Sequence, residues 1–239
     1  GLPAQSTYTF RGNRLEVRAH GELVETRELV DPLAEVDRLR ESFRVPRVPG
    51  LPAFTGGLVG YFGFESIGYI EPRLSGGDKP DQLGTPDAFL MLSEELAVFD
   101  NLKGRLYLIV HADPAEPQAY SKAVRRLDEL VYRLRHSGRS YPDVLDPSLL
   151  KEEDFISGFT RDGFIRAVEA IKEYIRAGDV FQVVLSQRMS VPFRARPVDV
   201  YRALRALNPS PYMYFLDLDG TQVVGSSPEA MLAGGFTPV

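Results

Sequence analysis

The glycine-rich segment Gly56–Glu65, GGLVGYFGFE, constrains the fold more than any other part of this sequence. Most of its other residues are apolar and favour strands, but glycines interrupt them at short intervals. Glycines in a strand either let a neighbouring backbone approach closely or mark bulges in a curved sheet. A phosphate-binding loop is a weaker interpretation, because the lysine of such loops is absent and no helical pattern follows. The segment therefore predicts a strand in a tightly packed or curved sheet.

Further strands are predicted on both sides of this segment. Between Tyr8 and Leu29, apolar and polar residues roughly alternate and glycines stand at the breaks, which is typical of an antiparallel meander. Residues 88–92 form another expected strand, and residues 96–99 and 105–110 form an expected hairpin. The pair Asp219-Gly220 is a strong hairpin signal between two more strands. Most of the sheet structure is therefore expected to be antiparallel.

Two helices are predicted in the first half of the chain. Asp31 has the properties of an N-cap and Pro32 those of a first helical residue, and Val36 and Leu39 then share one face of the helix. The second helix covers residues 115–135, where apolar residues form a stripe that faces a core.

Two further helices are predicted after a polar connection, residues 136–154, which is the best candidate for a boundary within the chain. Thr160 can cap the first of these helices, and Gly178 ends it. The other begins near Pro197 and cannot pass Pro209, because proline lacks the N–H that a helix requires.

A predicted strand, Val180–Leu185, contains one polar residue, Gln182, among apolar ones. The strand period of two places Gln182 on the face opposite Phe181 and Val183. A buried amide has to be hydrogen-bonded, so Gln182 either ties down backbone or faces a ligand. The residues alone favour the structural role and leave the ligand role open.

The segment Ser226–Glu229 places a carboxylate after a turn whose geometry a proline restricts. Loop residues that follow a strand in this way often reach into a site. The alternative is a helix N-terminus, with Ser227 as its cap and Glu229 stabilised by the helix dipole. The residues alone leave both interpretations open.

Composition excludes several classes of function. The 239 residues are 44% hydrophobic and 26% charged, which suits a soluble globular protein with a sizeable core. The net charge of -5 argues against nucleic acids and anionic membranes as partners, since both attract clustered Lys and Arg. No apolar run approaches the roughly 18 residues of a spanning helix, and the lack of cysteine excludes disulfides. We therefore expect a cytoplasmic protein.

Four segments occur in the same order and at similar spacing in one known family. They are FTGGLVGYFGFES, GDVFQVVLSQR, NPSPYMYFLDL and VGSSPE. By these segments the chain resembles, over nearly its whole length, the large subunit of anthranilate synthase, component I of tryptophan biosynthesis, among the chorismate-utilising enzymes. The resemblance implies an α+β fold with large antiparallel β-sheets, arranged as an orthogonal β-sandwich and flanked by helices.

The resemblance also implies an activity. Component I converts chorismate, with ammonia and Mg2+, to anthranilate and pyruvate, and a glutamine amidotransferase subunit, component II, normally supplies the ammonia. L-Tryptophan is the expected feedback inhibitor. The alternatives are aminodeoxychorismate synthase component I of the folate branch and a non-catalytic module that binds an effector.

Particular residues take their expected roles from this resemblance. Gln182 occupies a position that is typically lysine in isochorismate and salicylate synthases, where the lysine can activate water. A neutral glutamine is consistent with ammonia as the nucleophile. Glu229 matches the SPE motif and is, with Gln182, an active-site candidate. Pro211, Tyr212 and Met213 match the family's tryptophan site, and a restrained backbone, an aromatic face and a thioether suit an indole ring.

The chain also departs from the family pattern. The LLES-like stretch of the tryptophan site would precede Gly1, and the motifs that carry the Mg2+ ligands would follow Val239. We therefore expect a component I that is incomplete at both ends, with no metal ligands in this chain and no activity of the chain alone. The expected domains are residues 1–140, on the tryptophan-regulatory side, and residues 155–239, the start of a chorismate-binding catalytic domain.

Overall fold

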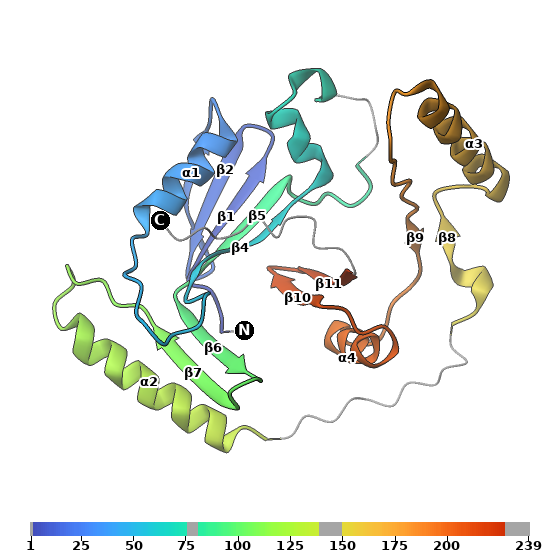
Figure 1. Cartoon of the computed structure of the whole chain (residues 1–239). Coiled ribbons are helices and arrows are strands. Elements are labelled where there is room, and N and C mark those ends of the chain that lie inside the picture. Colours follow the sequence, from blue (N-terminus) through green and yellow to red (C-terminus); the bar gives the residue numbers. More distant parts are fainter. Residues whose placement is uncertain (1, 76–80, 139–149, 228–239) are drawn as a thin grey trace. The chain divides into compact units, whose positions relative to one another are not determined.

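The computed structural model describes residues 2–75, 81–138 and 150–227 (Figure 1). The chain divides into two units, residues 1–139 with residues 216–223, and residues 140–215 with residues 224–239. Both units contain helices and antiparallel strands, which confirms the expected α+β class. The sandwich packing of the sheets stays a prediction. None of the helices in the described ranges is long and apolar enough to cross a membrane.

An antiparallel sheet of five strands forms the base of the first unit. The strands are β1 (Ser6–Arg11), β2 (Arg14–Ala19), β3 (Glu22–Glu28), β4 (Gly57–Phe62) and β5 (Ala88–Ser93). Their order across the sheet is β3-β2-β1-β5-β4. The predicted meander and both of the other predicted strands of this sheet are therefore confirmed.

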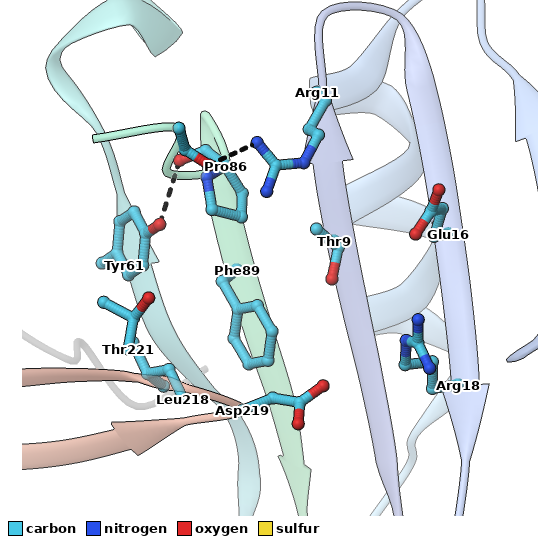
Figure 2. A pocket seen from close by; sticks show the side chains of 11 residues that line it. Thr9, Arg11, Glu16, Arg18, Tyr61, Pro86, Phe89, Leu218, Asp219 and Thr221 are labelled. Atoms are coloured by element: carbon cyan, nitrogen blue, oxygen red, sulfur yellow. Dashed lines mark hydrogen bonds between the residues drawn. The ribbon is translucent and has the colours of Figure 1, made fainter. Parts of the chain in front are cut away.

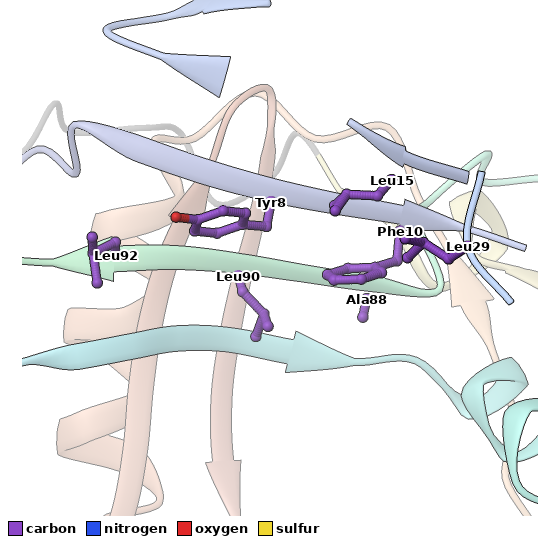
Figure 3. Packing of buried hydrophobic residues seen from close by; sticks show 7 residues of the cluster. All are labelled: Tyr8, Phe10, Leu15, Leu29, Ala88, Leu90 and Leu92. Carbon is purple, nitrogen blue, oxygen red and sulfur yellow. The ribbon is translucent and has the colours of Figure 1, made fainter. Parts of the chain in front are cut away.

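One face of this sheet carries the hydrophobic core of the first unit. Alternate strand residues point to opposite faces, so Tyr8 and Phe10 of β1 share a face with Leu15 of β2. The cluster comprises Tyr8, Phe10, Leu15, Leu29, Ala88, Leu90 and Leu92 (Figure 3). Phe10 and Leu15 are only 1% and 0% exposed, and complete burial of such a side chain contributes about 1.5–3 kcal/mol.

Helix α1, Pro32–Ser42, packs on this core through Val36 and Leu39. It begins where the sequence predicts. The Asp31 carboxylate accepts hydrogen bonds from the N–H groups two and three residues later, at 2.9 and 3.0 Å, and so satisfies donors that have no partner within the helix. Glu35, in the same helix, is a charged residue that is only 3% exposed.

The close approach of the β5 backbone explains why one residue of β4, Gly60, is a glycine. A Cβ atom at Gly60 would lie 1.8 Å from the carbonyl oxygen of Phe89 in β5. The first of the two interpretations of the glycine-rich segment therefore holds at Gly60. The chain then enters the short 3-10 helices η1 (Phe64–Tyr69) and η2 (Pro72–Leu74), which were not predicted because their three-residue turns lack the apolar period of an α-helix.

A hairpin and a long helix complete the first unit. Strands β6 (Glu95–Asp100) and β7 (Arg105–Val110) pair as predicted, and α2 (Ala119–His136) packs against β7. Arg126 of α2 also binds Glu95 of β6 through two hydrogen bonds of 2.7 and 2.9 Å. This bidentate ion pair ties the helix to the hairpin.

The start of α2 differs from the prediction. The helix begins at Ala119 rather than at Ala115, because Gln118 has a left-handed conformation with a φ of 60° and Pro117 disfavours helical geometry at the residue before it. The Asp113 carboxylate accepts from the N–H of Ala115 at 2.9 Å, and its carbonyl accepts from the N–H of Glu116 at 3.0 Å. These local bonds close a turn of their own, and the left-handed Gln118 separates that turn from the helix.

The second unit contains the two predicted helices, α3 (Arg161–Ala177) and α4 (Pro197–Leu207). Thr160 caps α3 by accepting a hydrogen bond from Gly163 N–H at 3.1 Å, and Gly178 ends the helix with a φ of 83°. Neither of these two fully described helices contains a buried residue. The shorter elements of the unit are η4 (Glu152–Asp154), β8 (Ile156–Ser157) and β9 (Met189–Ser190).

The prediction of a strand at Val180–Leu185 is wrong. The segment has no regular secondary structure, and the strand that follows it, β9, is confined to two residues that pair with β8. A strand requires a partner for its backbone N–H and C=O groups, and none of the described strands pairs with residues 180–188. Gln182 is accordingly exposed and not a buried amide.

Strands β10 (Tyr212–Leu218) and β11 (Thr221–Ser227) form the predicted hairpin. Asp219 and Gly220 have φ angles of 44° and 95°. Two successive residues with positive φ are what a type I′ turn requires, and this turn matches the right-handed twist of the flanking strands.

Candidate functional site

The segment Asn208–Met213, which joins α4 to β10, contains the residues expected to bind tryptophan. Helix α4 ends where the Asn208 N–H donates to the Leu204 carbonyl oxygen at 2.8 Å. The next residue, Pro209, has no N–H to continue the helix, and Pro211 restrains the backbone again two residues later. The turn into the strand therefore has few accessible conformations.

Two serine hydroxyls join this segment to the end of β11. The Ser226 hydroxyl donates to the Asn208 carbonyl oxygen at 2.8 Å, and the Ser210 hydroxyl donates to the Ser227 carbonyl oxygen. The Tyr212 N–H donates in turn to the Ser210 hydroxyl oxygen at 3.2 Å. We call Ser210 and Ser226, with these three bonds, the serine clasp. Because β10 and β11 are paired strands, the clasp holds together the open end of the hairpin.

Neighbouring residues of β10 point to opposite faces of the hairpin. Phe215 faces α4, where the centroids of its ring and the Tyr201 ring are 6.3 Å apart. Met213 shares that face and is half-buried, and Pro211 precedes it by two residues. Tyr212 lies on the other face and is 49% exposed. Tyr212 and Met213 therefore present their side chains on opposite faces of the hairpin, and the roles of Pro211, Tyr212 and Met213 in tryptophan binding stay predictions.

The two active-site candidates are not brought together by the described residues. Glu229 lies outside them. Gln182 lies on the extended segment after α3, where its side chain is exposed. Its neutral amide can donate and accept hydrogen bonds but cannot take a proton as a general base. The catalytic roles of both residues stay predictions.

A hollow of about 170 Å³ lies over the face of the five-stranded sheet opposite the core (Figure 2). Thr9, Phe89 and Tyr61 stand at one level across β1, β5 and β4 and form its base. The other lining residues are Arg11, Glu16, Arg18, Gly84, Pro86, Leu218, Asp219 and Thr221. All of them belong to the first unit. Sequence reasoning did not identify this hollow, although polar residues do alternate with apolar ones along β1 and β2.

Polar groups that line this hollow already form hydrogen bonds with other groups of the protein. The Arg11 guanidinium donates to the Gly84 carbonyl oxygen at 2.8 Å, and the Tyr61 hydroxyl donates to the Pro86 carbonyl oxygen at 3.0 Å. Burial raises the pKa of Tyr61, so this donor stays protonated at neutral pH. The hollow is also smaller than the roughly 300–1,000 Å³ of ordinary ligand pockets. We assign it no ligand.

Hydrogen bonds around Asp87 connect the loops at one end of the same sheet. The Asp87 carboxylate accepts from the Gly12 N–H at 2.6 Å, and the Tyr69 hydroxyl of η1 lies 2.9 Å from that carboxylate. Burial, followed by the hydrogen bond and the charge of Asp87, raises the pKa of Tyr69. The Asp87 carbonyl accepts from the Gly63 N–H at 2.6 Å. These bonds fix the position of the residues that follow β4. We therefore assign Asp87 a structural role.

Comparison with known proteins identifies the family. The family model for chorismate binding enzymes matches residues 3–234. The chain is 46% identical to anthranilate synthase component 1 of Pseudomonas putida over 234 residues, and 45% identical to the protein of that name from Neisseria meningitidis serogroup B over 235 residues. Each match covers 97% of this chain.

A solved structure agrees with these matches. The fold is similar to the crystal structure of anthranilate synthase component I from Streptococcus pneumoniae, with a TM-score of 0.71 and 30% identity over 95% of this chain. The chain spans about half the length of the proteins it matches, 47% of the two relatives and 49% of the crystallised protein.

Proposed function

This chain belongs to the family of chorismate-binding enzymes, and on that basis we propose that the whole protein is an anthranilate synthase component 1. The observation that carries the proposal is the match to relatives of that name, at 45–46% identity over 97% of the chain. The reaction would convert chorismate and ammonia to anthranilate, pyruvate and water. Ammonia attacks ring carbon C2 of chorismate as the C4 hydroxyl group leaves as water, and pyruvate is then eliminated as the ring becomes aromatic.

The same proposal includes a partner, a cofactor and L-tryptophan as the feedback inhibitor. Component II, a glutamine amidotransferase, would supply ammonia in the cytoplasm, and the name component 1 of the relatives supports a second subunit. Mg2+ would neutralise the carboxylate of chorismate. No described residues form a group of three or more His, Asp or Glu that could hold an ion, so we assign no Mg2+ ligand among them.

Two residues of this chain are proposed to act on chorismate. Gln182 would hydrogen-bond the substrate through its amide, and because it is neutral it would leave ammonia, rather than an activated water, as the nucleophile. Glu229 would place a carboxylate beside the active site. Support for both comes from the matching segments GDVFQVVLSQR and VGSSPE.

An assay of the whole protein with chorismate, Mg2+ and an ammonium salt tests the proposal. The expected result is the appearance of fluorescent anthranilate without any added lyase. A product that becomes aromatic only after a lyase is added would instead identify the folate-branch enzyme. Absence of chorismate turnover would leave the effector-binding module as the function. We expect residues 1–239 alone, assayed in parallel, to show no turnover.

Met213→Ala in the whole protein is expected to weaken inhibition by L-tryptophan more than it changes turnover. The lost thioether contact with the indole ring corresponds to about 1 kcal/mol, or roughly a fivefold rise in the half-inhibitory concentration. Tyr212→Ala is the matched control, because the Tyr212 side chain lies on the other face of β10. Equal effects of the two substitutions on inhibition, or none from Met213→Ala, would contradict this placement of the indole ring.

A further inference from the structure

The extended segment that carries Gln182 is held at its two ends (Figure 1). At its start, Gly178 closes α3, and the Asp179 N–H donates to the Tyr174 carbonyl oxygen at 3.0 Å. At its other end the chain enters β9, which pairs with β8, the strand that precedes α3 in the chain. Because none of the described strands pairs with residues 180–188, the position of the residues in between depends on these two ends.

The second of these ends has a side-chain anchor, the hydroxyl group of Ser157 in β8. The Gln187 side-chain amide donates to Ser157 Oγ at 2.6 Å, and the Phe159 N–H donates to the same oxygen at 3.0 Å. The Gly158 N–H donates to the Arg188 carbonyl oxygen at 3.0 Å. Side-chain and backbone bonds therefore join the end of β8 to the last residues of the segment. We call Ser157 and Gln187 the anchor pair.

The anchor pair matters more for position than for stability. Both residues are exposed, so water can replace much of their hydrogen bond when one partner is removed. Gln182 precedes Gln187 by only five residues, and none of the described strands forms a ladder with the residues between them. A displacement of about 1 Å in a group that orients a substrate can lower the rate roughly 100-fold. Loss of the pair is therefore expected to affect activity more than stability.

We propose that Ser157 and Gln187 are positioning residues for the reaction, and that together they place the Gln182 amide where it meets chorismate. This inference rests on the proposed function and deepens it, because it adds to the substrate contact the two residues that hold it. Neither of them is a catalytic residue, since both act through Gln182.

Ser157→Ala is expected to lower kcat/KM for chorismate by roughly 10- to 100-fold in the whole protein, assayed with Mg2+ and an ammonium salt. Gln187→Met has an unbranched side chain without an N–H donor, and we expect a decrease of the same size. Ser157→Thr keeps the hydroxyl group and should restore most of the activity. The midpoint of thermal unfolding should change little in all three variants, because the lost bond lies between exposed groups.

A double-mutant cycle separates positioning from a general structural role. Gln182→Ala removes the group that the anchor pair is proposed to place. Adding Ser157→Ala to Gln182→Ala should therefore lower kcat/KM by less than about twofold further. A merely structural role would give the same decrease with and without Gln182. Ser190→Ala is the matched control, because it removes an exposed hydroxyl group from the partner strand β9, and it should leave kcat/KM unchanged.

Two provisions keep the cycle decisive. If Gln182→Ala is too slow to assay, the same cycle is measured on the dissociation constant of chorismate by calorimetry, with ammonia and glutamine withheld so that chorismate persists. If Ser157→Ala does not fold, Gln187→Met takes its place, since it leaves β8 unaltered. Failure of both variants to fold would overturn the inference, because the anchor pair would then be structural.

The outcomes distinguish the inference from the proposed function. An unsubstituted protein that makes no anthranilate would refute the proposed function and the inference with it. A protein that makes anthranilate, but whose Ser157→Ala and Gln187→Met variants keep their full kcat/KM, would overturn the inference alone. Equal decreases with and without Gln182 would do the same, and so would full activity of Gln182→Ala, since the pair would then have no substrate contact to position.

Discussion

Gly60→Ala is expected to destabilise the five-stranded sheet strongly. The added Cβ atom would lie 1.8 Å from the Phe89 carbonyl oxygen and 3.0 Å from the Leu90 Cα atom, and both are backbone atoms of β5. A flexible side chain can move away from a new methyl group, but here β4 itself has to move. Ordinary overpacking costs about 1–3 kcal/mol, and we expect more than about 3 kcal/mol, a large part of the stability of a typical domain.

The effect of Gly60→Ala can be localised as well as measured. The midpoint of thermal unfolding should fall, and amide hydrogen exchange should show that β4 and β5 lose protection before α3 does. Gly138→Ala is the matched control, because a Cβ at Gly138 meets no atom within 4 Å. If Gly60→Ala unfolds at the same temperature as Gly138→Ala, β4 does not approach β5 as closely as the structure shows.

Glu35→Ala is expected to produce the second large loss of stability. Glu35 is 3% exposed, and its two carboxylate oxygens lie 2.8 Å from Arg27 Nη2 and 3.0 Å from Arg38 Nη2. Arg27 belongs to β3, so this ion pair ties α1 to the edge of the sheet. Removing one partner of a fully buried pair costs about 3–5 kcal/mol. Since the Arg27 side chain is 40% exposed and can be hydrated after the change, we expect about 2–3 kcal/mol.

Chemical denaturation of the whole protein checks this expectation, with Glu41→Ala as the control for an exposed glutamate of the same helix. A second comparison isolates the ion pair. In the double variant Glu35→Ala and Arg27→Ala, part of the loss should be recovered relative to the sum of the single substitutions, because no unpaired guanidinium is left. A loss from Glu35→Ala no larger than that from Glu41→Ala would show that the pair contributes little.

Local signals in the sequence predicted the parts of the fold that depend on a few neighbouring residues. Asp31 and Thr160 cap their helices as expected, and Gly178 ends α3 in a left-handed conformation. The Asp219-Gly220 pair forms the tight turn between β10 and β11. Each of these features is decided by the conformational preference of one or two residues and by hydrogen bonds within one turn.

Local signals failed where the outcome depends on other parts of the chain. Residues 180–185 have the composition of a strand, but composition does not supply a pairing partner, and the segment is irregular in the described structure. The expected burial of the Gln182 side chain was a wrong prediction for the same reason. The start of α2 was misplaced because the apolar pattern does not reveal the left-handed conformation of Gln118, which separates the Asp113 turn from the helix.

The candidate site likewise has features that the local sequence predicts and features that it does not predict. The matching segments predict Pro211, Tyr212 and Met213 together as tryptophan contacts, since adjacent residues in a motif cannot be told apart by sequence similarity. The strand geometry then separates Tyr212 from Met213, because they point to opposite faces. The bonds of Ser210 and Ser226 could not be predicted, since each joins residues more than a dozen positions apart along the chain.

The sequence by itself determined the family, the capped helices, the antiparallel strands and the glycine turns. These properties depend on residue identity and on the geometry of a few neighbouring residues, and the amino-acid sequence alone contains that information. Only the tertiary structure decided why Gly60 must be glycine, how Glu35 pairs with two arginines, and that two serines hold the proline turn against β11. Each of these results depends on distances between residues remote in sequence, and such distances exist only once the sheet and the hairpin have formed.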